Sequence, residues 1–453
     1  MKSEFLKELQ ERGFIAQMTH PQELDNLLSQ EKITAYIGFD CTAESLHIGS
    51  LMQIMILRLL QKHGHRPIVL LGGGTTKIGD PSGKDEARQI LNEEKIAKNL
   101  QGIKNTLAKF IDFGQGSNES SATSNSALLV NNDDWLKSLN YIDFLRDYGR
   151  HFSVNRMLSF DSVKLRLERE QPLSFLEFNY MILQAYDFYE LNKKHGCRLQ
   201  IGGSDQWGNI VNGVELIRRL TVSQKILDGL EKAGSERVNI AVGGSYVNQA
   251  RGIDNLPLDF KDPLSFGLTS PLITTADGKK MGKTADGAMW LDASMLAPFE
   301  YFQYFRNTHD ADVSRFLKFF TDLEMSEIAQ LEKLQGQEIN RAKEILAFEA
   351  TKICHGEKIA NETRQKAHEI FIAKNTQAYE NKEVVIGDGK KLIEIIKEIG
   401  AADSNAAAKR LIEGRAVKIN NEAVLDVNLT IIAKEEFNLS VGKKHFFKII
   451  VVA

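Results

Sequence analysis

A lysine-rich loop in the second half of the chain carries a dense cluster of charged groups. The segment Asp277-Gly-Lys-Lys-Met-Gly-Lys-Thr284 places three ammonium groups within five positions and surrounds them with glycines. Lysines on such a loop suit a polyphosphate whose charge changes during a reaction. A solvated run of charges is the usual alternative, so the loop by itself does not establish a site.

Two further segments have the composition of phosphate-binding turns. His47-Ile-Gly-Ser50 lies at the expected start of a helix, where unpaired N–H groups and a partial positive charge attract phosphate. Gly79-Asp-Pro-Ser-Gly-Lys84 is similar to a P-loop, yet Ile78 and Asp85 stand where that motif needs Gly and Ser or Thr. A P-loop is therefore excluded, and an ordinary turn remains the alternative for both segments.

Polar side chains share one face of an otherwise apolar helix expected over 175–195. Tyr180, Gln184 and Asp187 are spaced i, i+4 and i+7. Each would cost about 1 to 3 kcal/mol if it were buried without a partner, so partners must exist within the protein or on a ligand.

A glycine turn follows the next expected strand, in the segment Gln200-Ile-Gly-Gly-Ser-Asp-Gln-Trp-Gly208. The acidic residue after the glycines, Asp205, is suited to a ribose hydroxyl, as in other nucleotide-binding folds. A purely structural turn is the alternative.

The elements around these segments predict a doubly wound α/β sheet of Rossmann type. Residues 33–39 and 67–71 have the apolar runs of buried strands, and 50–63 has the pattern of a helix with an apolar face. A strand, a helix and a strand within fewer than 40 residues form a βαβ unit, which favours a parallel sheet. Ligands bind beyond the carboxyl ends of such strands, where Asp40 and 72–74 fall.

We expect several domains along the 453 residues, in this order: a catalytic domain over 1–292, a helical domain over 293–375, a linker over 376–389, and a small α+β domain over 390–453. The catalytic domain contains a weakly patterned insertion at about 221–261. The final domain has eleven basic against eight acidic residues between 390 and 448, whereas the whole chain carries a net charge of −3. This asymmetry indicates that the tail binds a polyanion.

Composition excludes several classes of protein. The chain is 42% hydrophobic and 26% charged with a mean hydropathy of −0.27, and its apolar runs are too short to span a membrane. The first residues lack the apolar core of a secretory signal, so we expect a cytoplasmic protein. Three cysteines (Cys41, Cys197 and Cys354) without C-x-x-C spacing predict neither a disulfide framework nor structural zinc.

In this order and spacing, the segments resemble the tyrosyl-tRNA synthetases of bacterial type, a family of class I aminoacyl-tRNA synthetases. The resemblance covers about 33–292 and rests on six motifs: Tyr36-Ile-Gly-Phe-Asp-Cys-Thr42, His47-Ile-Gly-Ser50, Gly79-Asp-Pro-Ser-Gly-Lys84, Gln184-Ala-Tyr-Asp187, Gln200-Ile-Gly-Gly-Ser-Asp-Gln-Trp-Gly208 and Lys280-Met-Gly-Lys-Thr284. The tail resembles an S4-like RNA-binding domain through Ala407-Ala-Lys-Arg-Leu-Ile-Glu-Gly-Arg-Ala-Val-Lys-Ile-Asn420.

The resemblance implies a role for each matching residue. A tyrosine substrate would be held at its phenolic hydroxyl by Tyr36 and Asp187, at its α-amino group by Asp80, Tyr180 and Gln184, and near its carboxylate and amino end by Gln206. ATP would be bound by Gly38, His47, Gly49, Gly203, Asp205 and Lys283. The reacting phosphates would be contacted by Thr42, His47, Lys84, Arg88, Lys280, Lys283 and Thr284. RNA phosphates would be contacted by Lys409, Arg410, Arg415 and Lys418.

The implied reaction joins L-tyrosine to ATP as tyrosyl-adenylate with release of diphosphate, then transfers tyrosine to the 3′-terminal adenosine of tRNA(Tyr), in a homodimer. The tyrosine carboxylate is already a nucleophile and diphosphate already a good leaving group, so the site needs positioning and positive charge rather than a general acid or base. We expect Mg²⁺ to accompany ATP, without a dedicated metal site or a tightly bound cofactor.

Three features depart from the family's pattern. Ser50 stands where the first signature commonly ends in His, the segment from about 221 to 261 is longer than usual, and Asn405 replaces an Arg that S4-like domains often carry. The first departure concerns a ribose contact, and the last removes one phosphate contact.

Two other functions stay open. One is a related synthetase that activates tryptophan, against which Tyr36 and Asp187 argue because an indole has no hydroxyl. The other is an RNA-binding factor of the same fold that has lost catalysis, against which His47, Lys280 and Lys283 argue.

Overall fold

The computed structural model describes residues 1–80, 91–114, 125–232, 264–278, 281–284, 287–371, 379–432, 436–442 and 445–452. The chain forms two compact units: Met1–Leu296 with His309–Ala342, and Ala297–Thr308 with Lys343–Ala453. Among the described helices, none combines the length and apolar character needed to cross a membrane.

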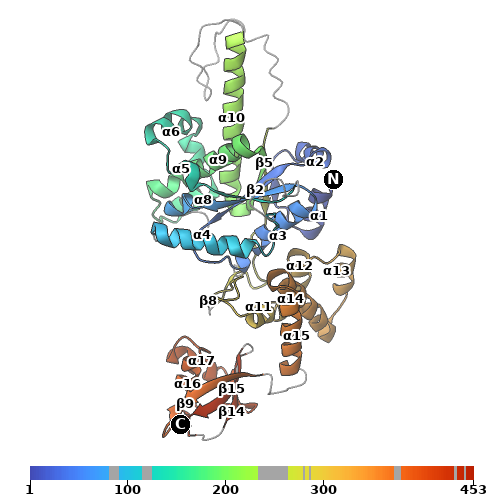
Figure 1. Ribbon diagram of the computed structural model, residues 1–453, viewed down its shortest axis with the longest axis vertical. Coiled ribbons are helices and arrows are strands. Elements are labelled where there is room, and N and C mark those ends of the chain that lie inside the picture. Colours follow the sequence, from blue (N-terminus) through green and yellow to red (C-terminus); the bar gives the residue numbers. More distant parts are fainter. Residues whose placement is uncertain are drawn as a thin grey trace. The chain divides into compact units, whose positions relative to one another are not determined.

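A six-stranded sheet forms the centre of the first unit, with helices on both of its faces (Figure 1). Its strands, in spatial order, are β1 (Gln17–Met18), β6 (Phe266–Ser270), β5 (Cys197–Gly203), β2 (Thr34–Asp40), β3 (Arg66–Gly72) and β4 (Leu128–Asn131). Strands β2 to β6 are parallel, and β1 pairs antiparallel with β6. The prediction of a doubly wound parallel α/β sheet is confirmed.

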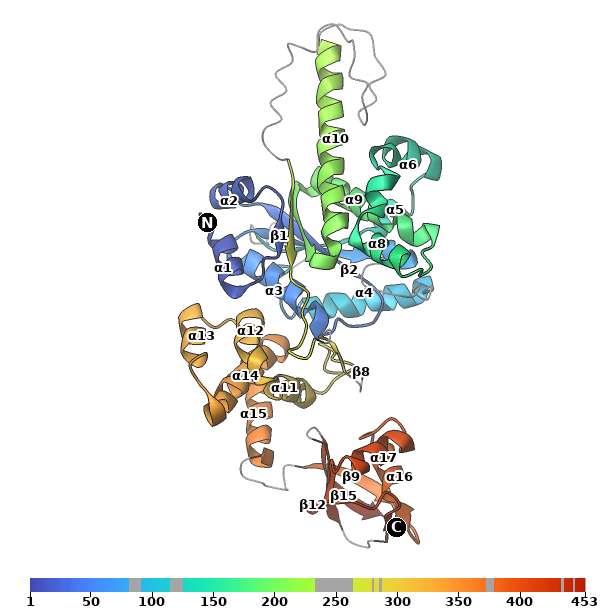
Figure 2. The same cartoon turned by 180° about the vertical axis from the view of Figure 1, so that it is seen from behind.

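The helices of the first unit are α1 (Glu4–Arg12), α2 (Pro21–Gln30), α3 (Ile48–Lys62), α4 (Glu93–Leu107), α5 (Asp133–Leu136), α6 (Tyr141–Asp147), α7 (Val154–Leu158), α8 (Asp161–Glu168), α9 (Phe175–His195), α10 (Trp207–Lys232), α12 (Asp310–Phe320) and α13 (Met325–Leu331). A short ribbon of β7 (Lys283–Thr284) and β8 (Gly287–Ala288) follows the lysine loop. Helix α10 extends into the expected insertion and projects away from the sheet in both views (Figures 1 and 2). The remainder of the insertion lies outside the described residues.

Helix α9 has the bounds that the sequence predicted, and local signals explain both ends. At its start Ser174 Oγ accepts a hydrogen bond from Glu177 N, while Glu177 Oε2 accepts one from Ser174 N, which is a capping box. At its end Gly196 adopts a left-handed conformation with φ of 60°. These two signals fix where α9 begins and ends.

The second unit contains helices and a small sheet domain. Its helices are α11 (Pro298–Arg306), most of α14 (Ile339–His355), α15 (Glu357–Phe371), α16 (Leu392–Glu398) and α17 (Asn405–Glu413). Five strands pair in the order β12 (Glu422–Ala423), β11 (Val417–Ile419), β14 (Phe437–Val441), β15 (His445–Val452) and β9 (Glu380–Val385). A separate pair joins β10 (Lys390–Lys391) to β13 (Thr430–Ile431). The α+β character expected of the tail is observed.

Two boundaries differ from the sequence expectation. Strand β9 falls within the stretch 376–389 expected to be a linker, yet it pairs in parallel with β15 and closes one edge of the tail sheet. The helices expected to form one domain over 293–375 are divided between the two units, because 309–342 belongs to the same compact unit as the catalytic sheet. The four-part division of the chain otherwise remains a prediction.

Candidate active site

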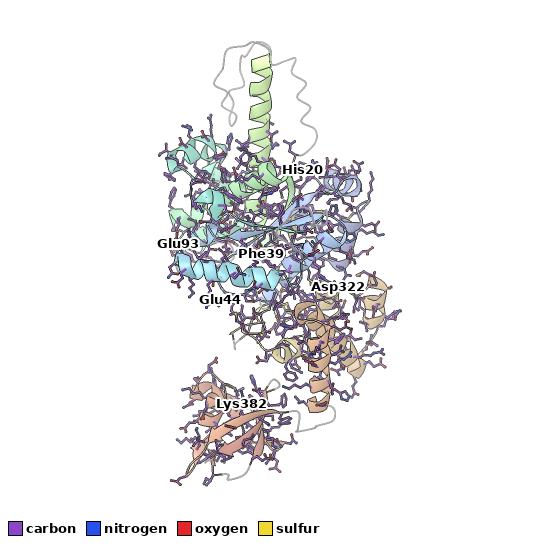
Figure 3. The ribbon with its side chains drawn as sticks, in the orientation of Figure 1. His20, Phe39, Glu44, Glu93, Asp322 and Lys382 are labelled. Atoms are coloured by element: carbon purple, nitrogen blue, oxygen red, sulfur yellow. The ribbon has the colours of Figure 1, made fainter. Side chains whose placement is uncertain are left out.

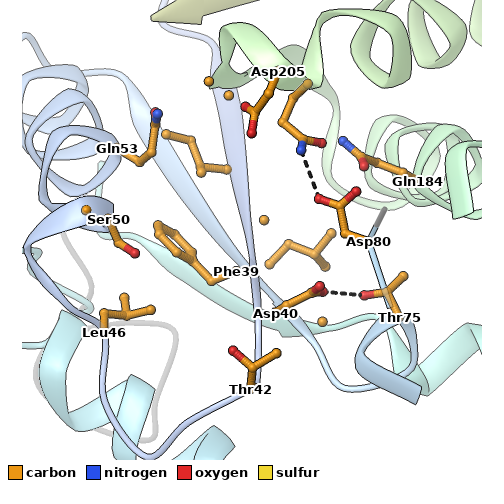
Figure 4. A pocket seen from close by; sticks show the side chains of 18 of the residues that line it. Phe39, Asp40, Thr42, Leu46, Ser50, Gln53, Thr75, Asp80, Gln184 and Asp205 are labelled. Carbon is orange, nitrogen blue, oxygen red and sulfur yellow. Dashed lines mark hydrogen bonds between the residues drawn. The ribbon is translucent and has the colours of Figure 1, made fainter. Parts of the chain in front are cut away.

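A cavity of about 670 Å³ opens at the carboxyl ends of β2, β3 and β5 in the first unit (Figure 4). Strand ends supply its floor, and α9, the start of α3 and the turn after β5 supply its walls. The predicted site residues that line it are Tyr36, Gly38, Thr42, His47, Gly49, Asp80, Tyr180, Gln184, Asp187, Gly203, Asp205 and Gln206. Residues from five separate motifs are thereby brought to one place.

Other predicted residues are not placed in this cavity. Lys84, Arg88 and Lys280 lie outside the described residues, as do the side chains of Lys283 and Thr284. The four cations assigned to RNA contacts belong to the second unit, where all are exposed: Lys409, Arg410, Arg415 and Lys418.

The buried end of the cavity pairs a carboxylate with a phenol. Asp187 is 2% exposed, and its oxygens accept hydrogen bonds from Trp135 Nε1 at 2.7 Å and Asn132 Nδ2 at 2.9 Å. Burial raises the pKa of Asp187 to about 7, although these two hydrogen bonds act in the opposite direction. Tyr36 is 1% exposed, and its hydroxyl makes no hydrogen bond within the described part of the chain. This end therefore offers a donor and an acceptor to one hydroxyl group.

The environment of Tyr36 keeps its hydroxyl neutral. Burial, and after it the charge of Asp187, raises the pKa of the Tyr36 phenol well above its ordinary value. Because the phenol does not ionise, it remains a hydrogen-bond donor throughout the physiological pH range.

Asp187 is oriented by two residues that were not predicted from the sequence. Asn132 directly follows β4, and its Oδ1 accepts from Gly74 N at 2.8 Å, so it ties the ends of β3 and β4 together. Trp135 lies in the short helix α5 that begins at Asp133. The polar run Asn131-Asn-Asp-Asp134, which follows an apolar strand, was the signal that could have found them.

A second carboxylate lies at the end of β2. Asp40 Oδ1 accepts hydrogen bonds from Thr75 Oγ1 at 3.1 Å and from Tyr180 OH at 3.3 Å. A Cβ on Gly72 would lie 2.5 Å from Thr75 Oγ1 and 2.6 Å from Asp40 Oδ1, so a side chain there would displace this hydrogen-bonded pair. The sequence placed Asp40 at the correct edge of the sheet but gave it no role, and it did not identify Thr75.

A chain of amide groups forms the wall opposite. Gln206 Nε2 donates to Asp80 Oδ2 at 2.9 Å (Figure 4), and Asn209 Nδ2 donates to the side-chain oxygens of both Gln184 and Gln206 at 3.0 Å. With Asp40, these groups surround the middle of the cavity with oxygen acceptors. Such a set suits an ammonium group.

At the opposite end of the cavity, the two signature segments meet through their glycines. His47 Nδ1 caps α3 by accepting from Gly49 N at 2.9 Å. A Cβ on Gly49 would lie 3.0 Å from Met281 O, and one on Gly282 would lie 2.8 Å from Gly49 N. Ile48 N and Met289 N continue this contact, donating to Met289 O and Gly282 O at 2.9 and 3.0 Å. Glycine is thus required at both positions for the lysine loop to reach the start of α3.

Between the two ends, the cavity is open to a flat group. A Cβ placed on Gly38 would meet nothing closer than 4.0 Å, so this part of β2 forms a bare floor. Ser50 and Gln53 on α3 face Asp205 across it (Figure 4), and Gln53 Nε2 donates to Ser270 Oγ at 3.0 Å. The position at which the family commonly has His is therefore a cavity wall, lined here by the shorter Ser50.

Within the described residues, no group of three or more His, Cys, Asp or Glu side chains is arranged to hold a metal ion. The three cysteines are buried and form no disulfide.

The chain is similar over most of its length to known tRNA synthetases. Residues 28–372 match the family model described as tRNA synthetases class I (W and Y). The chain is 53% identical over 460 residues to the tyrosine–tRNA ligase of Wolbachia pipientis subsp. Culex pipiens (strain wPip), covering 99% of this chain and 98% of that one. It is 49% identical to the tyrosine–tRNA ligase of Caulobacter sp. (strain K31), covering 98% and 96%.

Among solved structures, a C-terminally truncated mitochondrial tyrosyl-tRNA synthetase of Aspergillus nidulans superposes with a TM-score of 0.65 at 30% identity. The match covers 81% of this chain and 94% of that one.

Proposed function

Since the chain belongs to the class I tyrosine–tRNA ligases, we propose that its cavity performs both steps of that reaction. In the first, L-tyrosine and ATP form tyrosyl-adenylate and diphosphate. In the second, the tyrosyl group passes to the 3′-terminal adenosine of tRNA(Tyr). The observation that carries the assignment to this cavity is its buried end, where Tyr36 and Asp187 offer a donor and an acceptor.

The phenolic hydroxyl of tyrosine would complete the polar network at that end. It would donate to the carboxylate of Asp187 and accept from the hydroxyl of Tyr36. Phenylalanine would leave both groups buried and unpaired, which costs more than the contact itself contributes. Tyrosyl-tRNA synthetases discriminate against phenylalanine by a factor on the order of 10⁵, which illustrates this effect.

The amino acid's other end would lie among the acceptors of the middle wall. Asp80, Tyr180 and Gln184 would hold the α-amino group, and Gln206 would lie near the carboxylate. The bonds from Gln206 to Asp80 and from Asn209 to Gln184 fix these side chains before substrate binds. Such preorganisation presents the carboxylate oxygen to the α-phosphate of ATP.

ATP would lie along the floor and the phosphate end. The adenosine would rest over Gly38 and Gly203, with Asp205 accepting from a ribose hydroxyl. Thr42 and His47 would contact the γ-phosphate. The leaving diphosphate would be stabilised by Lys84, Arg88, Lys280, Lys283 and Thr284. Mg²⁺ would arrive bound to the phosphates of ATP, since it keeps several waters and favours phosphate oxygens.

The reaction at this site separates the remaining alternatives. A tryptophan-activating enzyme would leave Tyr36 and Asp187 unsatisfied, and an inactive binding factor would catalyse no exchange. Amino-acid-dependent exchange of labelled diphosphate into ATP, measured across the twenty amino acids, tests all three. Exchange that depends on tyrosine alone is expected. Equal exchange with phenylalanine or tryptophan, or none at all, would overturn the assignment.

The tail would bind tRNA through its cationic side chains. Lys409 and Arg410 lie exposed on α17, Arg415 follows that helix, and Lys418 lies exposed on β11. Each contact with a phosphate contributes to affinity in a way that falls with salt. Removal of the domain should begin before Glu380, because β9 is part of its sheet.

We also propose that the protein acts as a homodimer. Large apolar side chains are exposed along one stretch of the first unit, from α6 to the start of α9: Tyr141, Ile142, Val154, Leu158, Leu165, Leu167, Phe175 and Leu176. Clusters of this kind mark protein–protein interfaces. Sedimentation at micromolar concentration should give a dimer, and Ile142→Asp with Phe175→Asp should weaken it. A fully active monomer would contradict the proposal.

A further inference from the structure

A buried aspartate on α12 contacts the segment from which the lysine loop begins. Asp312 is 3% exposed and lies in the first turn of α12. Its Oδ2 accepts a hydrogen bond from Ala276 N at 2.8 Å. Ala276 immediately precedes the loop that opens at Asp277, so Asp312 fixes the loop's backbone at its entrance.

Arg315, one turn further along α12, makes a second contact with the same segment. Its Nη2 donates to Asp312 Oδ1 at 2.5 Å and also to Thr274 O. The pair therefore holds two successive points of the chain, at 274 and 276. Pairing with Arg315 also compensates the cost of burying the Asp312 carboxylate.

The far side of the loop is fixed by different groups. Met281 N donates to Ile273 O at 3.1 Å, which closes the loop across its base. Gly282 then packs against Gly49 at the start of α3. The entrance is thus held by side chains of α12, and the exit by the backbone of the His47 segment.

Helix α12 is itself tied to the same layer of helices that carries His47. Arg12 on α1 donates to Lys318 O on α12 at 3.1 Å and to Thr321 O and Leu323 O just beyond α12, and it also pairs with Glu8 on its own helix. Arg58 on α3 pairs at 2.6 Å with Asp322, which is labelled in Figure 3. Because α3 begins at the His47 signature, α12 links the two signature segments through one rigid arrangement.

We propose that Asp312, together with Arg315, is a positioning residue for the lysine loop. By holding the loop's entrance at a fixed distance from α3, the pair sets where the loop's ammonium groups meet the diphosphate. Asp312 lies outside the cavity lining and acts through the loop. The inference rests on the proposed role of the loop in ATP activation.

The test compares Asp312→Asn with wild type in the full-length protein. Asparagine keeps an acceptor for Ala276 N but loses the ion pair with Arg315. We expect the single-turnover rate constant of tyrosyl-adenylate formation to fall about ten- to a hundredfold, the size of effect that a shift near 1 Å produces. The dissociation constant of tyrosine, which binds at the other end, should stay within about twofold. Asp312→Glu, which restores the charge, should recover part of the rate.

Glu332→Gln is the matched control. Glu332 directly follows α13, and its side chain also pairs with α12, where it accepts from Ser314 Oγ and from Lys318 Nζ, the latter at 2.8 Å. Within the described residues, neither of these contacts involves the lysine loop. This variant should form adenylate at the wild-type rate. Arg315→Gln serves if Asp312→Asn fails to fold, because Arg315 is partly exposed and its loss should give the same selective fall in rate.

A folded Asp312→Asn or Arg315→Gln that forms adenylate as fast as Glu332→Gln would overturn the inference. So would a variant whose tyrosine affinity falls while the chemical step is unchanged. Failure of the proposed function is distinguishable, since wild-type protein would then show no tyrosine-dependent exchange at all.

Discussion

The two ends of the cavity are built in different ways. At the tyrosine end, Tyr36 and Asp187 lie on a strand and a long helix, and the carboxylate is already held by Trp135 and Asn132. At the phosphate end, the groups come from the start of α3 and from the loop that leads into the short strand β7, and the close approach of these two segments depends on Gly49 and Gly282. The first arrangement is complete before substrate arrives. With the proposed roles, the second would present positive charge where negative charge develops during the reaction.

This difference separates binding from catalysis. With the proposed roles, the buried hydroxyl site would determine which amino acid is accepted, while the cations of the loop would affect the transition state more than the ground state. Substitutions at the two ends should therefore change different kinetic quantities. Four predictions test the separation, from the largest expected effect to the smallest.

The largest effect should be seen at the tyrosine end, in the choice of substrate. Diphosphate exchange with tyrosine should exceed exchange with phenylalanine by a factor on the order of 10⁵, the figure already associated with this family. Tyr36→Phe should narrow the ratio, since it removes one partner of the hydroxyl. Steady-state exchange with both amino acids measures it. An unchanged ratio in Tyr36→Phe would show that Tyr36 plays no part in recognition.

At the phosphate end, Lys283→Ala should slow adenylate formation by about 2.7 to 4 kcal/mol, or roughly 10² to 10³ in rate, by analogy with other single preorganised donors. Tyrosine affinity should hardly change. Rapid-quench kinetics gives the rate and equilibrium dialysis the affinity. Lys104→Ala is a suitable control, because Lys104 is exposed on α4 and does not line the cavity. Loss of tyrosine affinity with an unchanged rate of adenylate formation would contradict the assignment of Lys283 to the chemical step.

The pH dependence of tyrosine affinity should come from the tyrosine end of the cavity and not from the phosphate end. The carboxylate of Asp187 would accept a hydrogen bond from the substrate's hydroxyl when it is ionised, and burial raises its pKa in the free protein to about 7. Tyrosine affinity should thus be full above pH 7 and fall by up to about tenfold for each unit below it. Titration calorimetry from pH 5.5 to 8.5 measures this. Histidines generally titrate in the same range, so His47→Gln is the control. This variant should keep the pH dependence of tyrosine affinity. Asp187→Asn should bind tyrosine more weakly, and its affinity should no longer depend on pH in this range.

The ionised carboxylate of Asp187 should favour tyrosine binding, but it lowers the stability of the folded protein. Its folded-state pKa lies above the ordinary value of 3.8, so the folded protein binds this proton more tightly than the unfolded chain. The resulting penalty is absent below pH 3.8 and grows as the pH rises toward about 7. The ionised carboxylate of Asp187 thus has a net cost in stability in the free protein, which a bound tyrosine hydroxyl would reduce.

The smallest effect should come from the tail, which neither end of the cavity requires. Arg410→Gln should reduce the slope of log tRNA affinity against log salt by roughly 0.7 to 0.9, the value of one phosphate contact. Adenylate formation should not change. Lys397→Gln, on the exposed surface of α16 outside the S4-like motif, is the matched control. Equal slopes for both variants and wild type would show that Arg410 contacts no tRNA phosphate.

Local signals in the sequence were sufficient for individual elements. Helix α9 could be bounded at both ends because its capping box, apolar pattern and terminal glycine all lie within the segment. The parallel strands β2 and β3 could be identified because both are buried on two faces and therefore consist of continuous apolar runs. Strand β9 was missed because it is an edge strand rich in charge, recognisable only through its partner β15.

The sequence by itself determined which residues share a face or a turn within one element. Examples are the polar stripe of α9 and the glycines of both signature segments. Only the tertiary structure decided who their partners are: Asn132 and Trp135 on Asp187, Gly282 against Gly49, and Asp312 at the entrance of the lysine loop. Periodicity arises from the repeat of a single helix or strand, so it can be seen in a short stretch of sequence. A contact between elements depends on how the sheet brings distant segments together, and no local pattern records that.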